Sequence, residues 1–232
     1  IRKLQELMQG FTTRTDGSAA EPFETEILYN PHLRSANAMI PGLVGVVMVF
    51  IATIMTAMGV VRERERGTLE QLMVTPLSPT ELMVGKITPY LAISLVDLLI
   101  VVLAGVYIFH VPFAGSPYLL AGLSLLFLVA CLGIGLLVST VSRTQQQAMQ
   151  LAVFTLLPQI LISGFIFPLS AIPWGVRWIA YAVPLTYFLP ICRGVFLKDL
   201  GMADLWPHAL ILLGYAVVVV CLAVWRFRRR LV

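Results

Sequence analysis

Long stretches almost free of charge run through this sequence, and they limit the folds that the chain can form. A helix needs about 20 apolar residues to cross the hydrocarbon of a membrane, where the backbone finds no outside hydrogen-bond partners. Stretches near that length lie at 39–61, 87–109, 118–141, 151–167 and 205–225. We therefore expect an all-α membrane protein, a polytopic helical bundle with five spans.

The composition excludes two other classes of protein. Hydrophobic residues make up 59% of the 232 residues and charged residues 12%, against about 45–50% and about 25% in soluble domains. A chain this apolar is neither a soluble enzyme nor intrinsically disordered, because disorder needs low hydrophobicity. In such a chain the net charge of +4 bears on membrane orientation more than on nucleic acid.

The positions of Lys and Arg predict the orientation. Five spans put the termini on opposite sides, and the positive residues next to spans, at 62–66 and 226–230, mark the cytoplasmic side. We therefore expect a cytoplasmic C-terminus, with 1–38 ending an extracytoplasmic segment and 39–232 forming the transmembrane domain. A chain that starts outside without a signal sequence needs an earlier span, so we expect a sixth helix before Ile1 in the natural protein.

The segment 62–86 is the most informative of the predicted cytoplasmic segments. Its alternating charges from Arg62 to Arg66 are followed by Thr68 and Gln71 at the spacing of a capping box. Leucines and a methionine then fall on one helical face, and a proline ends the pattern. We expect a short amphipathic helix that docks a cytoplasmic partner. The alternative is a solvated charge run that only sets the topology.

A second cytoplasmic segment, 142–150, is short, polar and barely charged. Three consecutive glutamines, Gln145, Gln146 and Gln147, suit a hydrogen-bonding turn against a neighbouring surface.

The segment 168–204 is predicted to lie outside, yet it remains strongly apolar. Prolines divide it into one piece from Ser170 to about Val183 and another from Thr186 to Phe196. Each piece is too short to span a membrane, so we expect a re-entrant or interfacial helical hairpin. An ordinary amphipathic loop is the alternative. Arg193 in the second piece is expected to snorkel or to find a partner.

Two polar residues interrupt the predicted spans. Asp97 is the only acid in mid-span, 11 residues beyond Lys86 and therefore roughly 16 Å deep at the rise of a helix. It would contact a cationic substrate, carry a proton or make an interhelical hydrogen bond. For Gln159, beside a proline, helix packing is the favoured role. Both are candidates for a substrate pathway.

Motifs for covalent chemistry do not occur in the sequence. Gly85 and Lys86 lack the upstream glycine and the following Ser or Thr of a P-loop. The three histidines form no metal-binding pattern. We therefore expect no catalytic residue, no metal site and no cofactor in this chain, which favours transport over catalysis.

Four segments resemble, in family order, those of ABC type-2 transporter permeases. NPHLRSANAMIPGLVG is similar to the junction before the family's second helix, and VRERERGTLEQLMVTPLSPTELMVGK to its first cytoplasmic loop. STVSRTQQQAMQ resembles its second inner loop, and SGFIFPLSAIPWGVRWIAYAVPLTYFLPICRGVFLK its outer re-entrant hairpin. The family's first helix and most of the extracytoplasmic domain that follows it have no counterpart in this sequence.

The resemblance implies a permease of the bacterial inner membrane that pairs as a homo- or heterodimer. Each half would bind a separate ATP-binding subunit, which holds ATP and Mg²⁺, and a periplasmic adaptor protein accompanies some members. The charged loop would supply the coupling helix that sits in a groove of the ATPase. The coupling residues would be Arg62, Glu63, Arg64, Glu65, Arg66, Gly67, Thr68, Leu69 and Glu70.

The leading hypothesis is therefore the permease subunit of an ABC exporter that moves a hydrophobic or amphipathic compound outward by alternating access. A lipid or glycan exporter of the same family is an alternative. From another class, the alternative is an ATP-independent channel or a proton-coupled carrier that uses Asp97.

Overall fold

The computed structural model describes residues 35–67 and 79–231, all of them in one compact unit, Arg34–Val232. Every regular element in these residues is helical, which confirms the all-α prediction. The helices are α2 (Ser35–Glu65), α4 (Pro79–Tyr107), α5 (Pro117–Val141), α6 (Gln145–Ile162), the 3₁₀ turn η1 (Leu169–Ala171), α7 (Trp174–Tyr181), α8 (Leu185–Lys198) and α9 (Met202–Leu231).

Four of these helices, α2, α4, α5 and α9, are long and apolar enough to cross a membrane. They match four of the five predicted spans. Helices α7 and α8 would supply a fifth if they count as one span, but they meet at a bend of 78°. The chain is therefore a polytopic helical membrane protein, as predicted.

The prediction of a span at 151–167 was wrong in its boundaries. Helix α6 covers Gln145–Ile162, and it is not among the helices that are long and apolar enough to cross a membrane. Its first turn consists of polar glutamines, which lower its hydropathy. Its end is set by Gly164, whose φ of +93° continues no right-handed helix.

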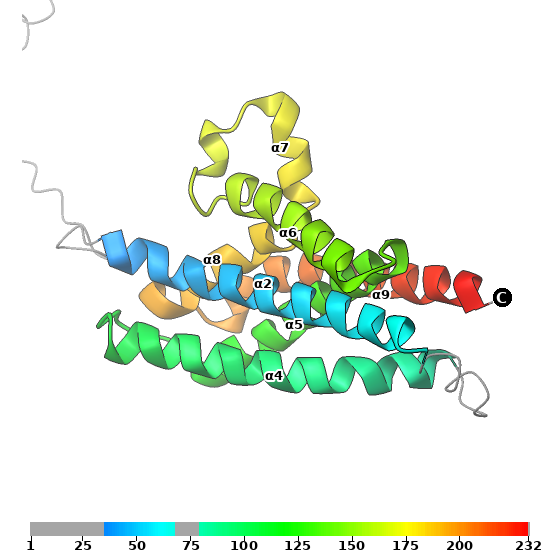
Figure 1. Ribbon diagram of the computed structural model, residues 1–232. Coiled ribbons are helices and arrows are strands. Elements are labelled where there is room, and N and C mark those ends of the chain that lie inside the picture. The colour runs from blue at the N-terminus through cyan, green and yellow to red at the C-terminus, as the bar shows by residue number, and fades with distance from the viewer. Residues whose placement is uncertain (1–34, 68–78, 232) are drawn as a thin grey trace, which may run out of the picture. The chain divides into compact units, whose positions relative to one another are not determined.

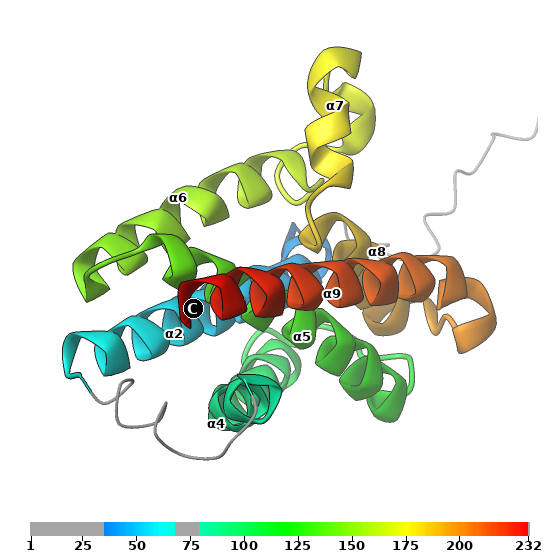
Figure 2. The ribbon, with the colours of Figure 1, turned by 90° about the vertical axis from the view of Figure 1, so that its right-hand side faces the viewer.

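Helices α2 and α5 lie at the centre of the arrangement. Helix α5 packs against α2 and α9, whereas α4 and α6 pack on different sides of α2 (Figures 1 and 2). In the most apolar stretch of α5 67% of residues are buried, against 17% in α4. The two ends of the bundle are named here after one residue at each, Arg64 and Arg193. The Arg64 end holds the last turn of α2 and the start of α6, and the Arg193 end holds the second half of α8 and the start of α9.

Glycines on α5 let its neighbours come close. A Cβ atom on Gly135 would lie 2.8 Å from the carbonyl oxygen of Thr53 on α2, and one on Gly133 would lie 2.9 Å from Cγ1 of Val219 on α9. Contacts between small residues hold helices together in lipid, where the hydrophobic effect gives no drive for association.

The segment predicted to form a helical hairpin contains two short helices of different character. Helix α8 enters the core, where Phe188 stacks on Phe127 of α5 with ring centroids 4.1 Å apart. Helix α7 is mostly exposed and carries Trp174 and Trp178. The start of the first piece differs from the prediction, because Ser170 lies in η1 and the N-cap of α7 is Pro173.

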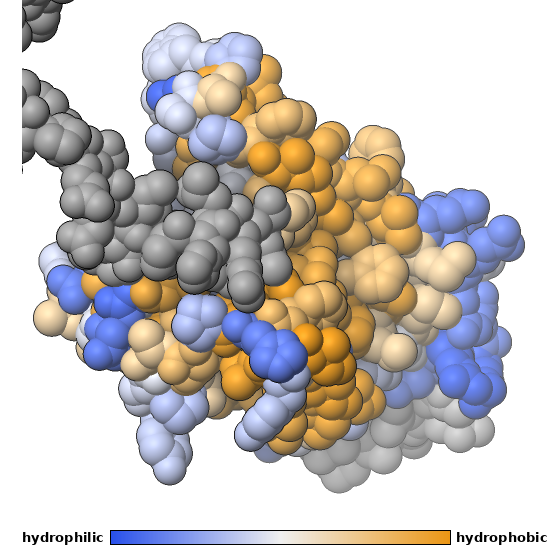
Figure 3. Space-filling model, turned by 90° about the vertical axis from the view of Figure 1, so that its left-hand side faces the viewer, coloured by the Kyte–Doolittle hydropathy of each residue, from blue (hydrophilic) through white to orange (hydrophobic). Residues whose placement is uncertain are grey.

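Large apolar side chains cover much of the outside of this unit. Figure 3 shows hydrophobic residues across the middle of one face and hydrophilic residues towards its edges. On α9 the exposed apolar residues include Trp206, Leu210 and Leu213. Such a surface is typical of a protein whose surroundings are lipid or another apolar surface.

Candidate functional site

The charged run that follows the first predicted span continues α2 as a helix, where a loop was predicted to begin at residue 62. Arg and Glu are good helix formers, and the amide of Arg66 still donates to the carbonyl of Arg62, at 3.1 Å. Gly67 then ends the helix with a φ of +69°. Of the predicted coupling residues, Arg62 to Glu65 therefore form the last turn of α2, and Arg66 and Gly67 follow it.

The other three predicted coupling residues, Thr68, Leu69 and Glu70, lie outside the described residues. The amphipathic helix predicted from Thr68 onwards also lies outside them. The chain is described again from Pro79, where α4 begins with Glu81 in its first turn.

Arg64 joins the end of α2 to the end of α5. Its Nη1 donates to the carbonyl of Ser142 at 2.9 Å and to that of Ser139 at 3.3 Å. Both carbonyls belong to the last turn and C-cap of α5. The final carbonyls of a helix lack partners in the helix and carry a partial negative charge, so the guanidinium satisfies them and balances their charge.

Glu65 joins the same end of α2 to the start of α6. Its Oε1 accepts a hydrogen bond from the backbone nitrogen of Gln145 at 3.0 Å, and its Oε2 accepts one from Nε2 of the same residue. The start of a helix carries a partial positive charge. Two adjacent residues of opposite charge on α2 thus bind helix ends of opposite polarity.

The predicted glutamine turn is in fact the capped start of α6. Thr144 is the N-cap, and its Oγ1 accepts a hydrogen bond from the amide of Gln147 at 3.2 Å. Gln147 in return accepts from the amide of Arg143, through Oε1, at 2.8 Å. Sequence reasoning missed this start, although the spacing of Thr144 and Gln147 is that of a capping box. Gln146 between them is exposed.

A hollow of about 480 Å³ lies between α2, α4 and the start of α6. Arg62 and Glu63 from the first predicted coupling segment line it together with Gln145 from the second. Tyr90 of α4 also lines it and occupies the space where Gly59 of α2 has no side chain. The structure therefore brings the two predicted cytoplasmic segments to one place, at the Arg64 end.

The two predicted substrate-pathway residues are not brought together. Asp97 is half-buried on α4, and its Oδ2 is buried with no hydrogen-bond partner among the described residues. Gln159 is buried on α6, where its Nε2 donates to the carbonyl of Thr155 at 3.4 Å. Because α4 and α6 pack on different sides of α2, these residues belong to separate surroundings.

Arg193 finds the partner that the sequence led us to expect. Its Nη2 donates to the carbonyls of Gly164 and Phe165, both at 3.4 Å.

Among the described residues, no three His, Cys, Asp or Glu side chains are grouped so that they could hold a metal ion.

Comparison with known proteins identifies a family of membrane transporters that matches this chain. The family described as ABC-2 family transporter protein matches residues 2–225 of the chain. The chain belongs to this family. The resemblance seen in the sequence is thereby confirmed.

Relatives within the ABC-2 family include three permeases of Escherichia coli (strain K12). The probable multidrug ABC transporter permease YbhS is 35% identical over 100% of the chain and 62% of its own length. YbhR, with the same description, is 29% identical over 98% of the chain and 63% of its own length. The inner membrane transport permease YhhJ is 31% identical over 89% and 55%. The chain thus spans about three fifths of these relatives.

Proposed function

We propose that this ABC-2 family chain is part of the permease subunit of an ABC exporter. A separate ATP-binding subunit would dock at the Arg64 end, which would be cytoplasmic, together with the C-terminus. ATP and Mg²⁺ would bind to that subunit, so the chain itself would not be an enzyme. A second permease half would complete the transporter. The cargo would be a hydrophobic or amphipathic compound that leaves the bacterial inner membrane by alternating access.

The contacts of Arg64 and Glu65 carry this proposal. They fasten the last turn of α2 to the end of α5 and the start of α6, so a push on this turn acts on three helices at once. Helix α5 in turn packs on α9 through Gly133. A partner that moves the charged turn would therefore displace the centre of the bundle, as an ATP-driven transporter requires. The multidrug descriptions of YbhS and YbhR support an amphipathic cargo.

Purification of the full-length protein from its native membranes tests the proposal. We expect a P-loop subunit to be recovered with it, and hydrophobic or amphipathic compounds to stimulate ATP hydrolysis by the complex. The variant Glu65→Ala should insert normally and lose most of that stimulation.

A second candidate function is a proton-coupled carrier, which the buried Oδ2 of Asp97 suits. The same preparation tests it. That function would be supported by a protein recovered alone whose transport survives ATP depletion and fails in Asp97→Asn. Such a result would contradict the ABC exporter proposal.

A further inference from the structure

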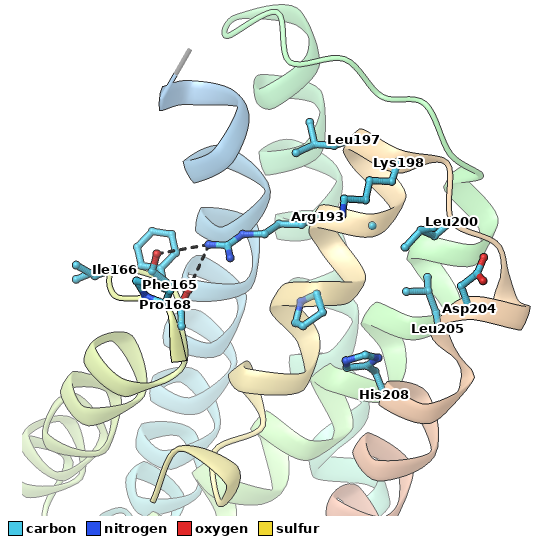
Figure 4. Close-up of a pocket in the computed structure, with 13 residues that line it drawn as sticks. Phe165, Ile166, Pro168, Arg193, Leu197, Lys198, Leu200, Asp204, Leu205 and His208 are labelled. Carbon is cyan, nitrogen blue, oxygen red and sulfur yellow. Dashed lines mark hydrogen bonds between the residues drawn. The ribbon is translucent and has the colours of Figure 1, made fainter. Parts of the chain in front are cut away.

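A second cavity lies at the Arg193 end, far along the chain from the charged turn of α2. It has a volume of about 570 Å³ and is lined by the segment after α6, by α8 and by the start of α9 (Figure 4). Arg193 and Lys198 of α8 line it, with Asp204 and His208 of α9. These charges sum to one positive when His208 is neutral.

Two side chains that line this cavity each carry a buried nitrogen atom without a hydrogen-bond partner among the described residues. These atoms are Nε of Arg193 and Nδ1 of His208. A buried donor without a partner is costly, and most buried polar groups in proteins have one. Nη2 of Arg193 donates to the carbonyls of Gly164 and Phe165 over long bonds, both of 3.4 Å.

The rest of the wall is largely apolar. Phe165, Ile166, Leu197, Leu200 and Leu205 line the cavity as well. Figure 4 shows Arg193 and His208 on neighbouring helices of the same cavity. A guanidinium and an imidazole within an apolar wall suit a ligand that joins an anionic group to hydrocarbon. Arg is the side chain that best matches the planar pairs of oxygen atoms on phosphate.

We propose that this cavity binds the phosphate group of an amphipathic ligand, with the guanidinium of Arg193 and the imidazole of His208 as donors and the hydrocarbon along the apolar wall. The proposal does not depend on ATP-driven export, because it concerns a different end of the molecule and different residues. The phosphate would belong either to a phospholipid of the membrane or to an amphiphile that diffuses to the site.

The test measures ligand binding to the full-length protein purified in dodecyl maltoside. Dodecyl phosphate is the probe, and the maltoside has the same hydrocarbon with an uncharged head. We expect dodecyl phosphate to raise the unfolding temperature in a saturable way. Inorganic phosphate at the same concentration should have little effect, since it gains nothing from the apolar wall. Equal effects of the two phosphates would overturn the amphipathic part of the proposal.

Three variants locate the site. We expect Arg193→Met to weaken dodecyl phosphate binding about tenfold or more, the usual consequence of losing a charge-assisted hydrogen bond. His208→Phe should weaken dodecyl phosphate binding several-fold. If Arg193→Met does not fold, the His208→Phe variant alone tests the site. The matched control is Arg177→Met, because Arg177 also donates to backbone carbonyls, those of Ser170 and Ile172, outside this cavity. Unchanged affinity in both Arg193→Met and His208→Phe would overturn the proposal.

Native mass spectrometry of the wild-type protein then separates the two sources of phosphate. A phospholipid that stays bound to the wild type and is lost from Arg193→Met or His208→Phe would identify the membrane as the source. Saturable binding of dodecyl phosphate without any retained phospholipid would support a diffusing amphiphile. Retention of the same phospholipid by all variants would count against this cavity.

Discussion

Glu65 accepts hydrogen bonds from both the backbone and the side chain of Gln145, although 80 residues separate the two in the sequence. The first of these residues ends α2 and the second begins α6. Together with the neighbouring contact of Arg64 to α5, this pair makes the charged turn of α2 a junction of three helices.

A double-mutant cycle on Glu65 and Gln145 tests whether the pair transmits the action of the ATPase. Glu65→Ala removes both hydrogen bonds, whereas Gln145→Ala removes only the one from the side chain. We therefore expect Glu65→Ala to reduce substrate-stimulated ATP hydrolysis more than Gln145→Ala does. The double variant should resemble Glu65→Ala alone, since residues that act as a pair are not additive. Additive losses would show that the two residues act separately.

Replacement of Arg64 should destabilise the protein. Arg64→Met keeps a long apolar side chain and removes the donor to the last carbonyls of α5, so we expect a loss of about 1–3 kcal/mol in stability. Thermal unfolding in detergent measures this as a lower midpoint. Arg66→Met is the matched control, because Arg66 is an exposed arginine one turn or less away on the same segment. Equal midpoints for the two variants would contradict the role given to Arg64.

Two glycines of α5 should respond to alanine with opposite signs. Gly135→Ala would place a Cβ 2.8 Å from backbone of α2, and such overpacking costs about 1–3 kcal/mol. At Gly122 an added Cβ meets nothing within 4 Å, so Gly122→Ala should raise stability slightly through helix propensity. Thermal unfolding of both variants checks this. A stable Gly135→Ala protein would mean that α2 and α5 can move apart without cost.

Asp97 offers a test between a structural and a functional carboxylate. Since its buried Oδ2 has no hydrogen-bond partner among the described residues, we expect Asp97→Leu to raise the unfolding midpoint, because it removes a costly buried polar group. Export of lipophilic cations should fall relative to that of neutral compounds of similar size. A lower midpoint would instead reveal an interhelical hydrogen bond that holds α4 in place.

Much of the helix pattern could be predicted from the sequence, because lipid forces long apolar stretches into helices. The four long helices follow from this rule, and the prolines around α7 and α8 mark the bent pair. The end of α6 was missed because the apolar run continues past it, although Gly164 just after the C-cap is the kind of residue that ends a helix.

The junction at Arg64 and Glu65 could be predicted only in part. The charged run and the glutamines each stood out as polar segments between spans, but nothing in a single sequence says that residues 80 positions apart will meet. That Arg62 to Glu65 would extend α2 was foreseeable from their helix propensity and from Gly67 as a stop. Whether the buried nitrogen atoms of Arg193 and His208 find a hydrogen-bond partner depends on how α8 and α9 pack. The hydropathy of the sequence does not reveal this packing.

Helix α2 runs without a break from its buried middle to Glu65. It therefore fixes the direction in which Arg64 and Glu65 point around the helix axis and their position along it. One residue inserted after Val61 would turn Arg64 and Glu65 by about 100° and point both away from the helix ends that they bind. Seven inserted residues would restore the angle to within about 20° but would carry the pair about 10 Å further along the axis. The protein should therefore accommodate substitutions in this stretch more easily than insertions or deletions.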